Sequence, residues 1–234
     1  VVRARWAAGG RPPKTRLAGA IPTEDARRRL YAAFLEDTIR ACREVEGTVL
    51  RVAYARDGGT EWLCELGLED DELLPQRGSD LGARERGVFG DLFADGFSRV
   101  VMIGSDLPTL PMRHITGAVT RLDTNTVVLG PSEDGGYYLI GLASAGPAIR
   151  VPEVFSDIHW STPSAFEDTV AAAGRAGLTV ERVPTWYDVD DEVGLKRLRR
   201  DLDDPERAAR APRTVQVLSE IFEQETGDRR HETE

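Results

Sequence analysis

The chain has few cysteines, no long apolar run and almost no lysine. Its two cysteines, Cys42 and Cys64, have neither metal-ligand nor redox spacing, which excludes a disulfide framework and indicates reduced thiols in a cytoplasm. No apolar stretch approaches the ~18 residues that span a bilayer. No charged and then apolar leader opens the sequence. We therefore expect a cytoplasmic protein that does not contact membranes.

Several signatures of common enzymes are also missing. Gly-x-Gly-x-x-Gly does not occur, so binding of a dinucleotide redox cofactor is unsupported. Neither the phosphate-binding Gly-x-x-x-x-Gly-Lys-[Ser/Thr] nor the Gly-x-Ser-x-Gly of serine hydrolases is present. His114, His159 and His231 share no metal-ligand spacing. His159 next to Trp160 could line a pocket, but a packed surface histidine is the simpler interpretation.

Acidic residues outnumber basic residues by 40 to 30, yet positive charge is concentrated near the start. The formal net charge is -10 over 234 residues, which argues against nucleic-acid partners. Residues 1–22 nevertheless hold five cations and no acid. Glycine-rich backbone and a few cations after a first strand can bind an anion such as phosphate, although a solvated basic loop is the alternative. The cations are Arg3, Arg5, Arg11, Lys14 and Arg16.

Apolar runs alternate with helical patterns along the chain, which predicts an α/β fold with a mostly parallel sheet and helices on both faces. We find no repeat or linker, so residues 1–225 are expected to form one domain and residues 226–234 a flexible tail. We expect strands at 1–6, 48–54, 99–104, 126–130, 137–142 and 178–183. A short strand and a loop are expected over 72–82, followed by a helix to about residue 95. Further helices are expected to open at 22–23 and to cover 60–67, 111–122, 164–176, 192–202 and 215–222.

Two acidic segments follow predicted strands. Asp106 comes just after the apolar run 99–104, where open α/β sheets bind ligands and a carboxylate can hold a divalent cation against phosphate. Asp188 and Asp190 alternate after the strand at 178–183, so in extended chain they point the same way and could supply a second ligand. Asp191 is expected to cap the next helix. The alternative is that all of these are caps or turn residues.

Two glycine-containing loops are further candidates. Gly135 and Gly136 follow the acids Glu133 and Asp134, and paired glycines permit close backbone approach to a ligand, although an acidic hairpin turn is the alternative. The loop 76–84, with Asp80 and Arg84, could contact a base or ribose, or Asp80 or its neighbour could cap the following helix.

Taken in order, six stretches resemble one family. "KTRLAG", "GSDLGAR", "VMIGSDLPTLP", "VVLGPSEDGGYYLIGL", "FSDIHWSTPSAFEDT" and "YDVDDEVGL" resemble bacterial glycosyltransferase-like proteins of the nucleotide-diphospho-sugar transferase superfamily. Members are known as radical-SAM- or selenodomain-associated transferases and as arsenosugar-biosynthesis glycosyltransferases. The chain is more distantly similar to 2-phospho-lactate guanylyltransferase and molybdenum cofactor guanylyltransferases.

The resemblance implies a GT-A-like Rossmann-type three-layer sandwich that binds a nucleotide at the strand ends. It implies catalytic roles for Lys14, Asp106 and Asp134. Mg²⁺ or Mn²⁺ would be bound by Asp106 and Asp190, with Asp188 as a further ligand. The implied nucleotide contacts are Lys14, Thr15, Arg16, Asp80, Leu81, Gly82, Arg84, Ser105 and Asp106, and the implied acceptor contacts are Asp134, Gly135, Gly136 and Trp160.

The leading hypothesis is therefore a metal-dependent glycosyltransferase with a nucleotide-sugar donor and a small-molecule acceptor, and it could form a homo-oligomer. One alternative is a nucleotidyltransferase that joins a nucleoside triphosphate to a phosphorylated acceptor. A second is an inactive nucleotide-binding protein, because the first strand carries arginines and its prolines are displaced from the family's pattern. Glu133 and Asp134 are candidate catalytic bases, and a phosphate acceptor would need none.

Overall fold

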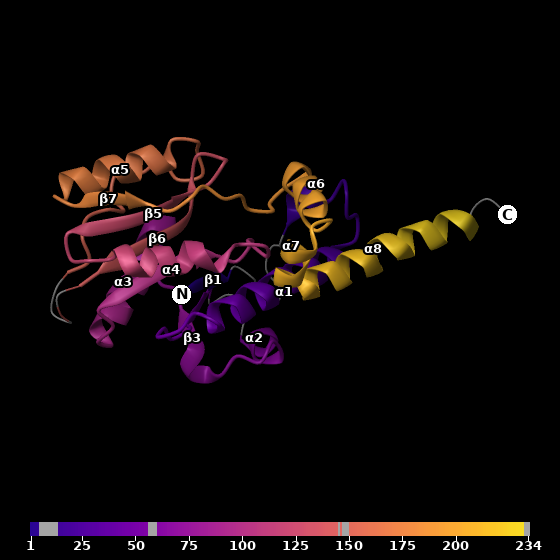
Figure 1. Cartoon of the computed structure of the whole chain (residues 1–234), viewed down its shortest axis with the longest axis horizontal. Coiled ribbons are helices and arrows are strands. Elements are labelled where there is room, and N and C mark those ends of the chain that lie inside the picture. The colour runs from indigo at the N-terminus through magenta and orange to yellow at the C-terminus, as the bar shows by residue number, and fades with distance from the viewer. Residues whose placement is uncertain (5–13, 56–59, 145, 147–149, 232–234) are drawn as a thin grey trace.

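A seven-stranded sheet is the centre of the fold in the computed structural model, which describes residues 1–4, 14–55, 60–144, 146 and 150–231 (Figure 1). The strands are β1 (Val2–Ala4), β2 (Val52–Tyr54), β3 (Leu73–Pro75), β4 (Arg99–Gly104), β5 (Thr126–Pro131), β6 (Tyr137–Ala143) and β7 (Thr179–Arg182). The helices are α1 (Glu24–Arg43), α2 (Glu61–Glu65), α3 (Leu81–Ala94), α4 (Met112–Arg121), α5 (Ala165–Arg175), α6 (Glu192–Asp201), α7 (Pro205–Arg210) and α8 (Pro212–His231), with short 3-10 helices η1 (Thr15–Leu17) and η3 (Asp70–Glu72).

The strand order is β3-β2-β1-β4-β6-β5-β7, with β1 and β4 in the interior of the sheet. All neighbouring pairs are parallel except the two that involve β6, which runs antiparallel to both β4 and β5. The expected mostly parallel sheet is therefore confirmed. β6 follows β5 after a tight turn, and only an antiparallel strand can be reached by so short a connection.

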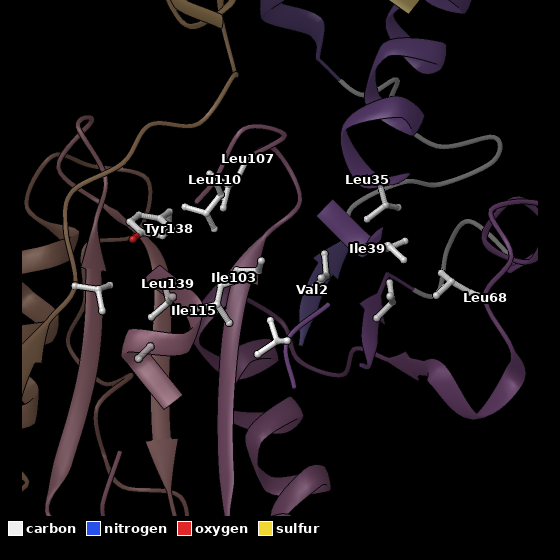
Figure 2. Packing of buried hydrophobic residues seen from close by; sticks show 14 of the residues in the cluster. Val2, Leu35, Ile39, Leu68, Ile103, Leu107, Leu110, Ile115, Tyr138 and Leu139 are labelled. Carbon is white, nitrogen blue, oxygen red and sulfur yellow. The ribbon is translucent and has the colours of Figure 1, made fainter. Parts of the chain in front are cut away.

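Helices cover both faces of the sheet, as the three-layer prediction required. Val2, Ile103 and Leu139 face α1 and α4 on one side, where they pack with Leu35 and Ile115 (Figure 2). The alternate residues of the same strands face α3 and α5 on the other side. This alternation follows from the two-residue period of a strand, and each apolar face buries the surface that drives folding.

A third apolar cluster lies beside the sheet and joins η1, α1, α6 and α8. It contains Leu17 of η1, Phe34 of α1, and Tyr187 and Val189 of the segment that follows β7. Figure 1 shows that segment leaving the sheet and crossing to α6. This cluster holds η1 and the segment 187–189 against the same side of α1, which determines where their polar neighbours lie.

Most expected elements are confirmed, but several differ, and the helix α7 was not expected. β2 covers only the last three residues of the expected strand at 48–54. β1 ends at Ala4, and the rest of the expected first strand lies outside the described residues. The last helix is longer than 215–222: α8 continues to His231, so most of the expected flexible tail is helical. Its residues are polar, but Glu, Gln and Arg have good helix propensity, and polarity alone was a poor reason to end the helix.

No helix within the described ranges is long and apolar enough to cross a membrane.

Candidate active site

The carboxyl ends of the parallel strands bring together three segments that are far apart in sequence. β4 ends at Gly104 and leads directly into Asp106. The segment after β7 carries Asp188 and Asp190, and it is tied to the first by a backbone hydrogen bond from Val189 N to Asp106 O (3.1 Å). Lys14 is the residue that precedes η1. The sequence predicted that these segments would meet at this edge, and the structure confirms it.

Lys14 is the centre of the site. Its Nζ lies 2.8 Å from Asp106 Oδ2 and 2.7 Å from Asp190 Oδ1, so one ammonium bridges both carboxylates. The lysine side chain is only 3% exposed, whereas those of Asp106 and Asp190 are 26% and 49% exposed. The residue has a φ of 57°, a left-handed conformation that non-glycine residues seldom adopt and that tends to mark functional sites.

Two aromatic side chains complete the surroundings of the ammonium, and the sequence analysis missed them as site residues. The rings of Tyr31 and Phe34 lie with their centroids 5.9 Å from Lys14 Nζ, within range of a cation–π interaction. Tyr31 also hydrogen-bonds Ser105, hydroxyl to hydroxyl, at 2.9 Å. The two aromatics are three residues apart on one face of α1, and that spacing was the available signal.

Alternation explains why the acidic segment presents its carboxylates together. Tyr187 and Val189 are buried in the cluster with α1 and α6, so Asp188 and Asp190 point the other way. Asp188 accepts a hydrogen bond from Ser132 Oγ (3.3 Å). Asp191 instead accepts from the backbone N–H groups of Val193 and Gly194 and caps α6, as expected. The alternative interpretation of all three aspartates as caps therefore applies to Asp191 and not to Asp188 or Asp190.

Negative charge exceeds positive charge inside the site. Burial raises the pKa of Asp188 to about 6, and the neighbouring carboxylates of Asp190, Asp134 and Asp106 add to the shift. Burial also raises the pKa of Asp106, although Lys14 opposes the change. Burial would likewise raise the pKa of Asp190, but Lys14 outweighs it and holds that pKa below its usual range. For Lys14 itself, burial opposes the charge, yet Asp106 and Asp190 raise the pKa above its ordinary value.

The donor chemistry fits a divalent cation only in part. Within the described ranges, no three His, Cys, Asp or Glu residues are placed to hold a metal by themselves. Mg²⁺, however, is usually bound by one or two carboxylates together with substrate phosphates and water. Asp106 and Asp190 supply two such carboxylates from adjacent segments, and the surplus negative charge that raises the pKa of Asp188 favours an added cation.

The remaining residues of the expected phosphate loop lie near the surface. Thr15 is half-buried and Arg16 is exposed, and the positive charge of Arg16 helps to lower the pKa of Asp190. Arg5 and Arg11 lie outside the described residues. Lys14 faces Asp106 and Asp190 in this structure. A phosphate that contacts Lys14 must therefore also lie close to these two carboxylates. The carboxylates and the cations of the predicted site therefore form one charged group.

The loop at the start of α3 has a different character. Asp80 caps the helix by accepting a hydrogen bond from Ala83 N (2.8 Å), and Arg84 Nε donates to Gly78 O (3.2 Å). The structure thus gives Asp80 the capping role that was its alternative interpretation. Leu81 begins α3. A Cβ on Gly82 would lie 2.8 Å from the Trp160 ring, so this glycine permits close packing of Trp160. Gly82, which was expected to contact the nucleotide, therefore lies against Trp160, which was expected to contact the acceptor.

The turn between β5 and β6 also has structural roles. Gly135 has a φ of 90°, and a Cβ there would lie 2.3 Å from Pro163 O, so only glycine fits against the segment that leads to α5. Asp134 Oδ1 accepts a hydrogen bond from Gly136 N (2.9 Å), and Glu133 forms an ion pair with Arg197 of α6. The acidic turn expected as an alternative is confirmed, and both candidate bases have partners.

The fold as a whole is similar to those of solved structures. The chain is similar to the crystal structure of a protein from Desulfovibrio desulfuricans G20 whose name assigns it provisionally to the nucleotide-diphospho-sugar transferases. The TM-score is 0.80 and the identity 28%, over 95% of this chain and 96% of the other. A homologue of Mycobacterium tuberculosis Rv0371c from Mycobacterium sp. strain JC1 shares the fold (TM-score 0.50, 17% identity, 86% and 96% coverage).

The family can be stated directly. Residues 38–162 match the family of uncharacterized proteins conserved in bacteria called DUF2064, which is more than half of the chain, so the protein belongs to DUF2064. The match includes Asp106 and the Asp134 turn, whereas Lys14 and Asp190 lie outside it. No curated protein matches the chain by sequence.

Proposed function

We propose that the protein is a metal-dependent transferase that uses an activated nucleotide, and specifically a glycosyltransferase with a nucleotide-sugar donor. The observation that carries the proposal is the Lys14 bridge to Asp106 and Asp190 at the carboxyl ends of β1, β4 and β7. Ligands bind at this edge in open α/β sheets. Similarity to the Desulfovibrio protein supports the donor class. A place among radical-SAM- or selenodomain-associated transferases belongs to the same proposal.

The charges of the site suit a leaving diphosphate. Lys14 and Arg16 are the described cations of the basic loop, and Lys14 is already dehydrated by burial, so its charge acts in a medium of low dielectric constant. Fixed charge aimed at developing negative charge stabilises a transition state. Mg²⁺ or Mn²⁺ held by Asp106 and Asp190, with Asp188 nearby, would neutralise the diphosphate oxygens.

One observation favours a second candidate, a nucleotidyltransferase that joins a nucleoside triphosphate to a phosphorylated acceptor. Glu133 is paired with Arg197, and Asp134 accepts the Gly136 N–H beside the Asp188 carboxylate. Neither acid is a free base for a hydroxyl acceptor. A phosphate acceptor is already ionised and needs no base, so the engaged acids are compatible with this reaction.

A thermal-shift screen tests the proposal. UDP-, GDP-, ADP- and dTDP-sugars and the four nucleoside triphosphates are each added with and without Mn²⁺. A ligand at 100 times its dissociation constant stabilises the folded state by about 2.7 kcal/mol. We expect a metal-dependent rise in melting temperature with one nucleotide sugar. A rise with triphosphates alone favours the nucleotidyltransferase, and no rise with any donor contradicts both.

A further inference from the structure

His159 and Asp168 form a hydrogen-bonded pair at the start of α5. Asp168 Oδ2 accepts hydrogen bonds from the His159 backbone N–H (3.0 Å), from His159 Nδ1 (2.9 Å) and from Ser164 Oγ (3.1 Å). These bonds lower the pKa of Asp168, beginning with the His159 backbone N–H. Because an ionised carboxylate can only accept, the hydrogen of the neutral imidazole lies on Nδ1. Nε2 therefore carries a free lone pair, and the side chain is 77% exposed.

The backbone around this histidine is strained in the same way as at Lys14. Among the described residues, three that are not glycine have positive φ: Lys14 (57°), Asp157 (61°) and Ser161 (62°). Two of the three flank His159. Such conformations are unfavourable and tend to cluster at functional sites. The loop 157–161 thus shares positive-φ backbone with Lys14.

A continuous series of contacts connects the histidine loop to the charged site. Pro163 packs on Gly135, and Phe166 N donates to Gly135 O (3.0 Å). The turn that contains Gly135 reaches the acidic segment through Ser132 Oγ and Asp188 (3.3 Å). α5 precedes the parallel strand β7, so its first turn lies at the same carboxyl edge as Asp106.

Trp160, the next residue, contacts both α3 and β6. Its ring packs on Gly82 at the start of α3 and meets the Tyr137 ring edge-on, with centroids 6.2 Å apart. Trp160 is thereby fixed by two elements, and it fixes the adjacent His159 backbone. A base must be held in place to be effective, and this one is held by its aspartate on one side and by its tryptophan neighbour on the other.

We propose that His159 is the general base for transfer to a hydroxyl acceptor and that Asp168 positions it; this rests on the proposed glycosyltransferase function. The acceptor O–H proton moves to His159 Nε2 while the acceptor oxygen forms a bond to the anomeric carbon. The bond from that carbon to the diphosphate oxygen breaks, and the nucleoside diphosphate leaves with the electron pair. Direct displacement of this kind inverts the anomeric centre. Because the base removes a proton from the acceptor, the acceptor class is a small molecule with a reactive hydroxyl.

The test compares a nucleophile that needs a base with one that does not. Wild-type and His159→Asn proteins are given UDP-glucose, GDP-mannose, ADP-glucose or dTDP-glucose with Mn²⁺ and either glycerol or azide, and release of nucleoside diphosphate is measured. Asparagine can keep the donor to Asp168 but lacks Nε2. We expect the variant to lose roughly 10²–10⁴-fold in kcat with glycerol. Turnover with azide, an anion with no proton to remove, should be unchanged.

Two further variants separate catalysis from structure. Ser164→Ala removes another hydrogen bond to Asp168 Oδ2 without touching the imidazole, and we expect full turnover with both nucleophiles. Asp168→Asn weakens the orientation of the ring and should lower turnover with glycerol alone, by less than the histidine variant does.

Each remaining outcome overturns the proposal. Full glycerol turnover in His159→Asn, or an equal loss with both nucleophiles, removes the base role while the glycosyltransferase function stands. Failure of the wild-type protein to release nucleoside diphosphate from any donor overturns the proposed function and this inference together. Release of pyrophosphate from triphosphates assigns the nucleotidyltransferase reaction instead, in which no base is required.

Discussion

Two regions at the same edge of the sheet hold polar residues for different reasons. At the start of α3, Asp80 and Arg84 bond to backbone groups within six residues of themselves. Around Lys14, Asp106 and Asp190 meet across separate segments, and their contacts satisfy no helix end or turn. The first region can be explained by local folding alone. The second gathers two carboxylates and an ammonium from separate segments, an arrangement that is frequent at functional sites.

The largest expected effect comes from the carboxylates around Lys14. Asp106→Asn or Asp190→Asn should reduce metal-dependent donor turnover by roughly 10²–10³-fold or more, the scale for losing one stabiliser of developing charge. The measurement is the rate of nucleoside diphosphate release at saturating Mn²⁺.

Asp191 is the matched control for this loss because it follows Asp190 directly but only caps α6. Asp191→Asn keeps a good capping residue, so turnover should not change. If both neighbouring variants lost the same activity, the distinction between charged site and local cap would be wrong.

Removing the ammonium should affect stability next. Lys14→Met leaves two carboxylates close together without their counter-charge. We expect a loss of about 1–3 kcal/mol, less than for a fully buried pair because Asp190 is half exposed. Urea unfolding measures the loss. Mn²⁺ should stabilise this variant more than the wild type, since a divalent cation can replace the missing charge; equal stabilisation of both would argue against a metal at these carboxylates.

Packing at the start of α3 is expected to give an effect of similar size on stability. A Cβ on Gly82 would lie 2.8 Å from the Trp160 ring, whereas one on Gly90 would make only an ordinary contact, 3.7 Å from Val151. Gly82→Ala should therefore destabilise by about 1–3 kcal/mol through overpacking. Gly90→Ala in the same helix should stabilise by about 0.5–1 kcal/mol. Thermal unfolding compares them, and equal behaviour would mean that Trp160 moves freely.

The smallest effect is expected at Asp80. Asp80→Ala removes the cap of α3 and should lower the melting temperature, while Asp80→Asn keeps the cap and the melting temperature. Both variants should bind the donor found in the screen as the wild type does. Weaker donor binding by Asp80→Asn would end the contrast between the two regions, because it would show that this carboxylate contacts the ligand.

Much of the fold could be predicted because periodicity is a local property. β4 coincides with the apolar run 99–104, and Thr23 caps α1 where a helix start was expected. The direction of β6 was harder to predict, because the apolar pattern of a buried strand is the same whether the strand runs parallel or antiparallel to its neighbours. The extent of α8 was missed because its polar end has helix-forming residues and no apolar face to reveal it.

The site was predictable to the extent that it depends on strand ends. Asp106, Asp188 and Asp190 were expected at one edge because parallel strands end together, and they are there. That Lys14 would turn inward to bridge two of them could not be derived, because this requires the apolar cluster of η1, α1 and α6 to bury it. The pairing of His159 with Asp168 joins residues nine positions apart across a loop with left-handed backbone at Asp157 and Ser161, a path that the sequence pattern does not indicate.

The bridge from Lys14 to Asp190 spans 176 positions of the chain. Closing so long a loop is entropically unfavourable until other contacts have shortened it, so we expect this bond late in folding. During synthesis β1 and β4 can pair while Asp190 is still unmade, and Lys14 then has Asp106 alone. The charged site is thus completed by a segment that is made after every strand of the sheet. A nascent chain can therefore pair its strands before it can assemble the three charged residues.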